Sequence, residues 1–530
     1  MAAGAGMALA GGLRGAQVWA APGVLSPGTR PDPAKPEGTD TLPQVEHIVI
    51  YMQENHSYDS YFGMLDVGDG YTLSGGVPTN SVPDPGDGGN PFTVFHTPDT
   101  CQPGRGVSQS WNATHKQFNG GAMDGFLNDG NTNAMKYWDE SQLPFYYDLA
   151  RTFPLCDRWF ASAPCQTYPN RRFLQAATSV GIIATDTDAV LATPSAPNGT
   201  IWERLNDHGI SWNDYSLDLP DILLFPDVHK KSAKNLKSIQ NFLWDAEHGT
   251  LPQVSIISPG FNSYTEENPH DIALGEAYSA RMINAVMQGP GWDKTVMFFT
   301  YDEHGGYYDH VPPPPAVAPD SIKPDIHVPP DEPGAFDRYG FRVPSFVISP
   351  WGKTNHVSST VYDHTSILKF IETKFNLGAL TYRDANANDL LDTLDFSTQA
   401  FADPPTLAEP AFSGTSACEP DIADPKSIKA VQAPATPTTT TTTAPGGVTT
   451  TTAVGAGGAG TPGAPGAAPV PGEIAFTGRD VTTPTVVGVT AVATGFMFLA
   501  AKAKLDAERE AAWAAAQGTS RADDLEPPRP

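Results

Sequence analysis

A short run, Thr300–His310, combines carboxylates and histidines at a spacing that could bind a metal ion. Asp302 and Glu303 stand side by side, and His304 and His310 follow within the run. Carboxylates supply the hard oxygen ligands of divalent cations, and imidazoles supply nitrogen ligands. The alternative interpretation is an acidic turn whose two glycines adopt left-handed dihedrals. Taken alone, the run supports both interpretations equally.

A second polar pair, Glu54 and Asn55, follows the apolar segment Val45–Met52, which has the composition of a β-strand. The apolar stretch Thr295–Phe299 precedes the acidic run in the same way. Ligand sites in open α/β sheets lie at the carboxyl ends of strands. Both polar groups therefore stand where such a fold would place a reaction centre.

Thr167 precedes a Pro-Asn break, where a hydroxyl can be an exposed nucleophile or a helix cap. Because Ser, Thr and Asn are ordinary caps, the cap is the better interpretation of this residue by itself. Two further stretches, Ser110–His115 and Phe145–Phe153, are expected to border the same pocket.

Strand-like and helix-like segments alternate along the chain from Gln44 onward. This alternation predicts an α/β sandwich with a mainly parallel central sheet. Two stretches dense in Gly, Pro and Asp, Gly68–Pro91 and Pro312–Pro333, are expected to be loops, the second forming a rim or lid over the site. The remaining expected strands are Ser211–Ser216, Val254–Ser258 and Val343–Ser349, and the remaining expected helices are Asp271–Gln288 and His364–Phe375.

The charge balance restricts the possible partners. The chain has 59 acidic and 32 basic residues, a net charge of -27, which argues against nucleic-acid binding by neutralisation of phosphates. Any phosphate chemistry must therefore use a local metal ion. The four cysteines allow three disulfide pairings and show no metal-binding spacing, a pattern that is compatible with export.

The ends of the chain differ from its centre in composition. Residues 1–36 resemble the back half of a signal peptide, or form a disordered tail. The apolar, uncharged segment 481–501 is long enough for a transmembrane helix, and the basic residues behind it favour a cytoplasmic C-terminus. We therefore expect a cell-membrane protein with its catalytic domain outside. The expected divisions are 1–36, a catalytic domain at 43–423, a Pro/Thr/Gly/Ala-rich linker at 424–480, the helix at 481–501 and a cytoplasmic tail at 502–530.

The linker, with its Thr and Pro content, resembles the O-glycosylated stalks of cell surfaces, and we expect it to be disordered. Ile474–Gly478 resembles the signal that sortases cleave, although an isoleucine stands where leucine is expected. Attachment to the cell wall is therefore the alternative to plain membrane anchoring.

Four stretches taken together resemble the bacterial phosphoesterase family that contains phospholipases C and acid phosphatases. They are Glu54–Gly63, Thr167–Arg171, Asp302–Pro312 and Tyr362–Ser366. The resemblance implies an alkaline-phosphatase-like, three-layer α/β fold in which a metal-bound hydroxyl attacks phosphorus.

The resemblance also implies the roles of particular residues. Thr167 would be the nucleophile and would form a phosphothreonine. The family's His-Ser-Trp pattern reads Gln109-Ser110-Trp111 here, so a histidine that would act as general acid is missing. The implied ligands of a divalent metal ion are Glu54, Asn55, Thr167, Asp302 and Glu303; the further catalytic candidates are His115, His270, His310 and His356; the substrate-binding candidates are Gln109, Arg171 and His304.

Three hypotheses of function remain open on the sequence. The first is an anchored phosphoesterase that cleaves phospholipids or small phosphate esters, as a phospholipase C or an acid phosphatase. The second is a metal-binding surface protein whose activity was lost with the histidine at position 109. The third is an adhesin displayed on the Thr/Pro stalk. The intact metal and nucleophile positions favour the first.

Overall fold

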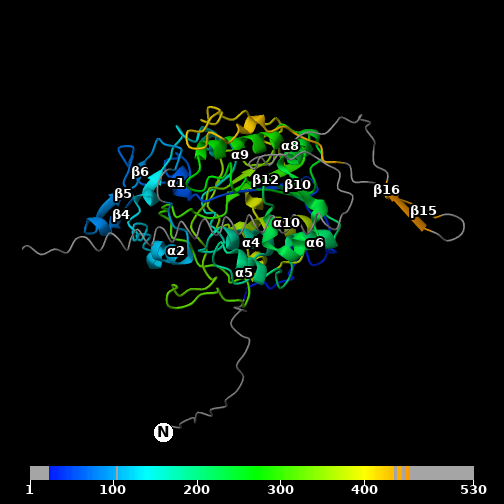
Figure 1. The fold of residues 1–530 in the computed structure, drawn as a ribbon, viewed down its shortest axis with the longest axis horizontal. Coiled ribbons are helices and arrows are strands. Elements are labelled where there is room, and N and C mark those ends of the chain that lie inside the picture. The colour runs from blue at the N-terminus through cyan, green and yellow to red at the C-terminus, as the bar shows by residue number, and fades with distance from the viewer. Residues whose placement is uncertain (1–22, 103–105, 435–438, 444–448, 454–530) are drawn as a thin grey trace, which may run out of the picture.

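The computed structural model describes residues 23–102, 106–434, 439–443 and 449–453, and is built on an eight-stranded sheet (Figure 1). The strand order is β10-β9-β11-β1-β12-β13-β8-β14. All neighbouring strands pair in parallel except β13, which is antiparallel to both of its neighbours. The strands are β1 (His47–Gln53), β8 (Leu155–Cys156), β9 (Trp212–Ser216), β10 (Leu236–Ser238), β11 (Val254–Ile257), β12 (Thr295–Tyr301), β13 (Phe346–Ile348) and β14 (Val357–Ser358).

β1 occupies the middle of the sheet, between β11 and β12. Ile50 lies opposite Ile256 on one side and Phe298 on the other, and all of β12 is buried. A parallel strand covered on both faces needs apolar residues at successive positions, which explains its continuous apolar run. The register also pairs Gln53 with Tyr301, so the residues that follow these two strands emerge side by side.

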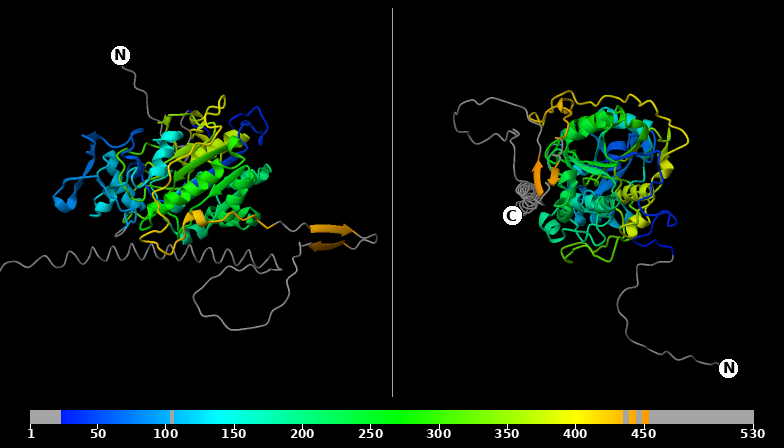
Figure 2. Two further views of the ribbon diagram at one scale, coloured as in Figure 1. Left: turned by 90° about the horizontal axis from the view of Figure 1, so that it is seen from above. Right: turned by 90° about the vertical axis from the view of Figure 1, so that its right-hand side faces the viewer.

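Helices cover both faces of the sheet, as the views from two sides show (Figures 1 and 2). One layer contains α8 (Ile239–His248) and α9 (Ile272–Met287), with α3 (Pro144–Thr152) packed against α9. The other contains α4 (Thr167–Ala176), which packs against α6 (Ile201–Asp207) and α10 (His364–Phe375). The predicted three-layer α/β sandwich with a mainly parallel sheet is thus confirmed.

The prediction that Gly68–Pro91 is loop was wrong in part, because this stretch forms two β-hairpins. Gly75 and Gly76, both with positive φ, make the two-residue turn of the first hairpin. The second hairpin turns through residues 85–89, a 3-10 turn at Pro85–Asp87 followed by Gly88 and Gly89 with positive φ. The further elements are β2 (Leu73–Ser74), β3 (Val77–Pro78), β4 (Ser81–Asp84), β5 (Asn90–Thr93), β6 (Phe95–His96), β7 (Lys136–Tyr137), α1 (Tyr58–Phe62), α2 (Trp111–Phe118), α5 (Thr187–Ala192), α7 (Pro226–His229) and α11 (Tyr382–Ala385).

The globular domain extends beyond the predicted limits at both ends. The backbone amide of Gly28 donates to the carbonyl of Ala379 (2.7 Å), so this part of the expected disordered tail packs on the domain. At the other end, the amide of Val431 donates to Gln240 (2.9 Å). A disulfide between Cys101 and Cys418 fastens the last part of the domain, while Cys156 and Cys165 are buried free thiols.

The predicted stalk contains two short strands, β15 (Thr439–Thr443) and β16 (Thr449–Ala453), which pair antiparallel to each other. The expectation of a wholly disordered linker is corrected for these residues. The predicted signal-peptide site near residue 20, the transmembrane segment 481–501 and the tail 502–530 lie outside the described residues. Among the helices that the structure does describe, none has both the length and the apolar character needed to span a bilayer.

A completely buried carboxylate, Glu266, lies on the α9 side of the sheet. Three tyrosine hydroxyls donate to it: Tyr61 at 2.5 Å, Tyr146 at 2.6 Å and Tyr301 at 2.7 Å. Burial raises the pKa of Glu266 to about 7, although the three hydroxyls oppose the shift. Tyr301 is the last residue of β12, so its hydrogen bond to Glu266 holds the end of this strand in place.

We expect Glu266→Gln to change how stability depends on pH. Between about pH 4.5 and 7, folded Glu266 keeps a proton that the unfolded chain releases, so raising the pH favours unfolding of the wild type. The wild type should lose up to about 3 kcal/mol relative to the variant across this window. Denaturant titrations at several pH values measure the difference. Glu247→Gln is the control for the loss of a carboxylate, because Glu247 is exposed and pairs with Arg281. A stability difference that does not change with pH would contradict the prediction.

Candidate active site

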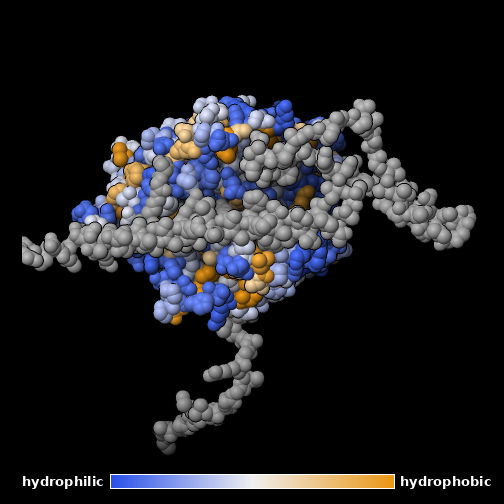
Figure 3. Space-filling view, in the orientation of Figure 1, coloured by the Kyte–Doolittle hydropathy of each residue, from blue (hydrophilic) through white to orange (hydrophobic). Residues whose placement is uncertain are grey.

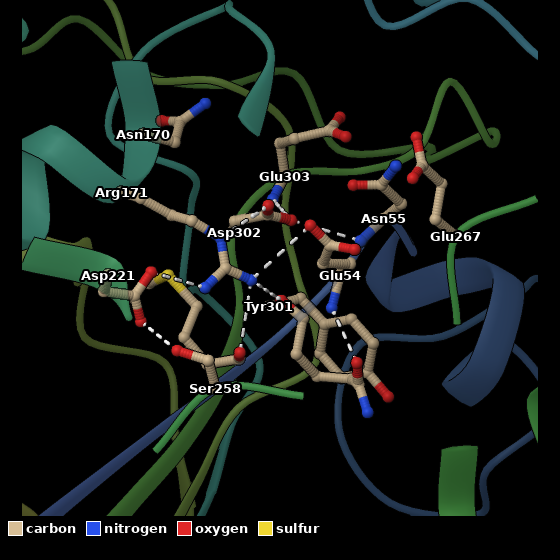
Figure 4. A network of polar contacts seen from close by, with 12 residues as sticks. Glu54, Asn55, Asn170, Arg171, Asp221, Ser258, Glu267, Tyr301, Asp302 and Glu303 are labelled. Atoms are coloured by element: carbon tan, nitrogen blue, oxygen red, sulfur yellow. Dashed lines mark hydrogen bonds and ion pairs between the residues drawn. The ribbon is translucent and has the colours of Figure 1, made fainter. Parts of the chain in front are cut away.

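The carboxyl ends of β1 and β12 bring four predicted metal ligands together (Figure 4). Glu54 and Asn55 follow β1, and Asp302 and Glu303 follow β12. The backbone amides of Asn55 (3.1 Å) and Glu303 (2.8 Å) both donate to Asp302 Oδ1. At most 2% of the surface of any of these four residues is exposed. The grouping expected from the two strand ends is therefore present.

The loop that carries Asp302 and Glu303 passes very close to the backbone of Asn55. A Cβ atom at Gly305 would lie only 2.0 Å from the Asn55 carbonyl oxygen, and Gly305 also has a positive φ of 64°. Glycine is therefore required at this position. The glycines of the run are thus left-handed, as the acidic-turn interpretation expects, and its carboxylates also join a cluster with Glu54 and Asn55.

The guanidinium of Arg171 lies at the centre of the acidic cluster. Its Nε donates to Asp302 Oδ2 (3.2 Å), its Nη1 donates to Asp221 Oδ1 (3.0 Å), and Glu54 Oε1 lies 3.9 Å from Nη2. Nη2 also donates to the carbonyls of Met52 and Gln53 at 3.2 Å. These contacts make Arg171 an internal counter-ion, rather than the substrate-binding residue that was predicted.

Two buried oxygen atoms in the cluster, Oδ1 of Asn55 and Oε1 of Glu303, have no hydrogen-bond partner. Such atoms are costly in a protein interior unless something satisfies them. Burial and the neighbouring carboxylate of Asp302 raise the pKa of Glu303 well above its usual value, and burial also raises the pKa of Asp302 despite Arg171. Acceptor-only oxygens that repel one another suit a divalent cation, so these residues fit the predicted metal ion.

Two groups of three His, Cys, Asp or Glu side chains in the described part of the chain have ligand atoms within 4.8 Å of one another, and both are already occupied by protein contacts. The carboxylates at the strand ends do not all approach one another that closely. The first group is Cys101 and Cys418 with Asp271, in which the two sulfurs form the disulfide. The second is Asp59, Asp309 and His310, in which Arg342 binds both carboxylates (2.8 and 3.0 Å). Neither competes with the strand-end cluster as a metal site.

Thr167 is the first residue of α4, and 4% of its surface is exposed. Gln166, not Thr167, holds the N-cap position, so the capping role considered for this threonine does not describe the structure. Arg171 lies one turn further along α4, on the same face as Thr167. Because Arg171 contacts Asp302, this face of α4 is directed toward the acidic cluster.

His304 and Gln109 lie beside the cluster. His304 Nδ1 is 3.3 Å from Glu303 Oε2, and its Nε2 donates to Gln117 Oε1 (2.9 Å). Burial lowers the pKa of His304 to about 3, so this ring is neutral. Gln109 is partly buried and follows Ser108, whose carbonyl would be 2.7 Å from a Cβ at Gly306. Gln109 is therefore next to the loop that carries Asp302 and Glu303.

The four predicted catalytic histidines do not gather at the cluster; none hydrogen-bonds to Asn55, Asp302 or Glu303 in the described part of the chain. His115 bonds to Trp111 O (2.7 Å) in a crevice beside Pro164, and burial lowers its pKa. His270 pairs with Glu419 at 2.6 Å. Their predicted roles depended on local sequence context, which does not specify where a ring points.

His310 and His356 are held in other surroundings. His310 pairs with Asp59 at 2.7 Å. Burial is the largest single effect on its pKa and lowers it, but the hydrogen bond to Asp59 and the charges of Asp59 and Asp309 together raise the pKa overall. His356 precedes β14 and therefore stands at the amino end of that strand, whereas the acidic cluster lies at the carboxyl ends. This placement argues against a catalytic role for His356.

Three residues of the site were not predicted. His364 Nε2 donates to the carbonyl of Asp302 (2.8 Å), and burial lowers its pKa to about 4. Asp221 receives a hydrogen bond from Ser258 (2.5 Å) as well as from Arg171. His364 belongs to one of the four stretches that carry the family resemblance, and Ser258 directly follows β11, so both had a signal in the sequence.

The chain is similar to known proteins over most of its length. The model of the Phosphoesterase family matches residues 45–378. Non-specific phospholipase C6 of Arabidopsis thaliana is 31% identical over 408 residues, which cover 69% of this chain and 75% of that protein. Phospholipase C B of Mycobacterium tuberculosis is 31% identical over 425 residues, which cover 70% of this chain and 81% of that protein.

Among solved structures, a protein in the alkaline phosphatase superfamily from Vibrio parahaemolyticus aligns with 71% of this chain and 76% of its own, at 10% identity and a TM-score of 0.34. The family match is the informative one, because it covers more than half of the chain and includes both strand ends, α4 and α10. The chain therefore belongs to the Phosphoesterase family and is a phosphoric ester hydrolase.

Proposed function

We propose that this protein is a metal-dependent phosphoesterase of the phospholipase C type, which attacks phosphorus with the hydroxyl of Thr167. The observation that carries the proposal is the pair of buried, unpartnered oxygens on Asn55 and Glu303, inside a carboxylate cluster that faces α4. The relatives named phospholipase C support a phospholipid as substrate. Small phosphomonoesters, the substrates of an acid phosphatase, are the alternative.

The ligands of the metal ion would be Glu54, Asn55, Asp302 and Glu303, together with Thr167. When bound, a divalent ion lowers the pKa of a coordinated hydroxyl and offsets the charge of phosphoryl oxygens. The protein itself holds the ligands in place through Arg171 and the backbone amides that donate to Asp302. The hydrogen bond from the Asn55 amide to Asp302 keeps the ends of β1 and β12 at a fixed separation.

In the proposed reaction Thr167, as the first residue of α4, would bring its oxygen and the start of the helix to the same phosphate. The first amides of a helix have no partner within it and attract anions. In this step the Thr167 hydroxyl loses its proton and its oxygen bonds to phosphorus, while the bond from phosphorus to the alcohol oxygen breaks and that oxygen takes up a proton. Water then cleaves the phosphothreonine and restores the hydroxyl, so the products are an alcohol and a phosphate monoester.

We also propose that the catalytic domain lies outside the cytoplasm, tethered by segment 481–501 or linked to the cell wall. The disulfide between Cys101 and Cys418 supports this location, because such bonds persist in oxidising compartments. Besides the tether, the lipid substrate would bring the domain into contact with a membrane.

Asp302→Asn tests the metal ion. It should lower turnover by roughly 100-fold or more, since even the loss of residues that merely support metal ligands costs 10–100-fold. Elemental analysis of the purified protein should find a divalent metal that the variant retains poorly. The matched control, Asp87→Asn on an exposed turn, should keep both metal and activity. A metal-free protein of full activity would refute the proposal.

Thr167→Ser and Thr167→Val separate a nucleophile from a structural residue. Serine keeps the hydroxyl and should retain much of the activity, whereas valine keeps the shape and should abolish turnover while the protein stays folded. Assays with phosphatidylcholine, sphingomyelin and p-nitrophenyl phosphate distinguish the phospholipase from the phosphatase. Acid quenching followed by mass spectrometry should place phosphate on Thr167, and phosphate trapped on another residue would overturn the assignment.

Protease added to intact cells tests the location. We expect cleavage within the Thr/Pro-rich segment 432–480 to release an active domain into the medium, because that segment lies between the packed domain and the proposed tether. Release that occurs only after the cells are lysed would contradict the proposed topology.

A further inference from the structure

The β2–β3 hairpin carries an exposed apolar tip. Leu73 is 47% exposed and Val77 is 63% exposed, and residues 72–77 are all exposed. Residues 70–83 contain no charged side chain, in a chain with a net charge of -27. Because it has no charged group, this segment would lose no ionic hydration on entering an apolar phase.

The geometry of the hairpin makes it a projection. Gly75 and Gly76 form the turn with φ values of 60° and 83°, and a Cβ atom added at either would meet nothing within 4 Å. Leu73 pairs with Pro78, and Ser74 pairs with Val77, so Leu73 and Val77 point to opposite faces of the ribbon. Both faces of the tip are thus apolar, which suits entry by the tip rather than packing along one side.

The base of the hairpin is tied to the active site. Tyr71 is buried, its amide donates to Gly63 O (2.7 Å), and its ring stacks on Tyr308 with centroids 6.5 Å apart. Tyr308 follows the loop that carries Asp302 and Glu303. The neighbouring hairpin β4–β5 projects at the same end of the molecule, where hydrophobic residues are visible on the surface (Figures 1 and 3).

We propose that the tip of the β2–β3 hairpin, Leu73–Val77, inserts into the surface of a lipid bilayer and brings the active site to its substrate. This inference rests on the proposed phospholipase activity. The surface it fits is zwitterionic rather than anionic, because Asp69 and Asp84 flank the uncharged stretch and the whole chain is acidic. Two aliphatic side chains give a weak, reversible contact, which suits an enzyme that must leave its product.

A fluorescent label on the tip tests the contact directly. Val77→Cys offers one exposed thiol for an environment-sensitive dye, since both native free cysteines are buried. Phosphatidylcholine vesicles added to the full-length protein should shift the emission of this label to the blue. The matched label at Leu191→Cys, an aliphatic position on α5 with 46% exposure, should not respond. No shift at position 77, or equal shifts at both positions, would overturn the proposal.

Kinetics distinguish this proposal from the phospholipase proposal itself. The double variant Leu73→Ser, Val77→Ser should hydrolyse phosphatidylcholine vesicles roughly tenfold more slowly at low lipid concentration, because it loses two apolar contacts with the bilayer. Its rate on a short-chain, monomeric phosphatidylcholine should equal that of the wild type. Equal losses on both substrates would refute the hairpin contact and leave the chemistry intact. A wild type inactive on both lipids would refute the proposed function, while the dye experiment would still report on the hairpin.

Discussion

The guanidinium of Arg171 is buried between the carboxylates of Asp302, Asp221 and Glu54, where it joins α4 to the ends of β1 and β12. Buried carboxylates without a counter-charge are strongly unfavourable, and removing one partner of such a group typically costs about 3–5 kcal/mol. Arginine cannot release its proton in a protein, so its charge is permanent. It neutralises the inner side of the cluster and leaves the oxygens of Asn55 and Glu303 available on the other side. The helix that carries Thr167 is placed by the same contact.

The sequence allowed most of the central architecture to be predicted. Continuous apolar runs such as Val296–Phe299 are required of strands covered on both faces, so β1, β9, β11 and β12 were located within a few residues. The helices expected at Asp271–Gln288 and His364–Phe375 correspond to α9 and α10. The two polar pairs of the site were found because each directly follows such a run. The density of Gly and Pro predicted the structure of Gly68–Pro91 less well, because these residues occur both in loops and in tight hairpin turns.

The features that the sequence did not specify are contacts between residues far apart in the chain. An arginine in a family motif looks like an anion binder, and only the fold shows that Asp221 reaches it from a different segment. His356 lies at the wrong end of its strand, which depends on the direction of β14 within the sheet. Contacts of His270 with Glu419 connect residues far apart in the chain. None of these relations has a local signal, because each depends on how distant segments pack.

The central place of β1 has a consequence for biosynthesis. This strand is made first, yet its neighbours β11 and β12 begin at Val254 and Thr295. At roughly 5–20 residues per second on a ribosome, the apolar segment waits about 10 s or longer before either partner exists. During that time its backbone groups and its apolar side chains are available to other chains, so the nascent protein is exposed to misassociation. A holding chaperone, or export before folding, would protect it.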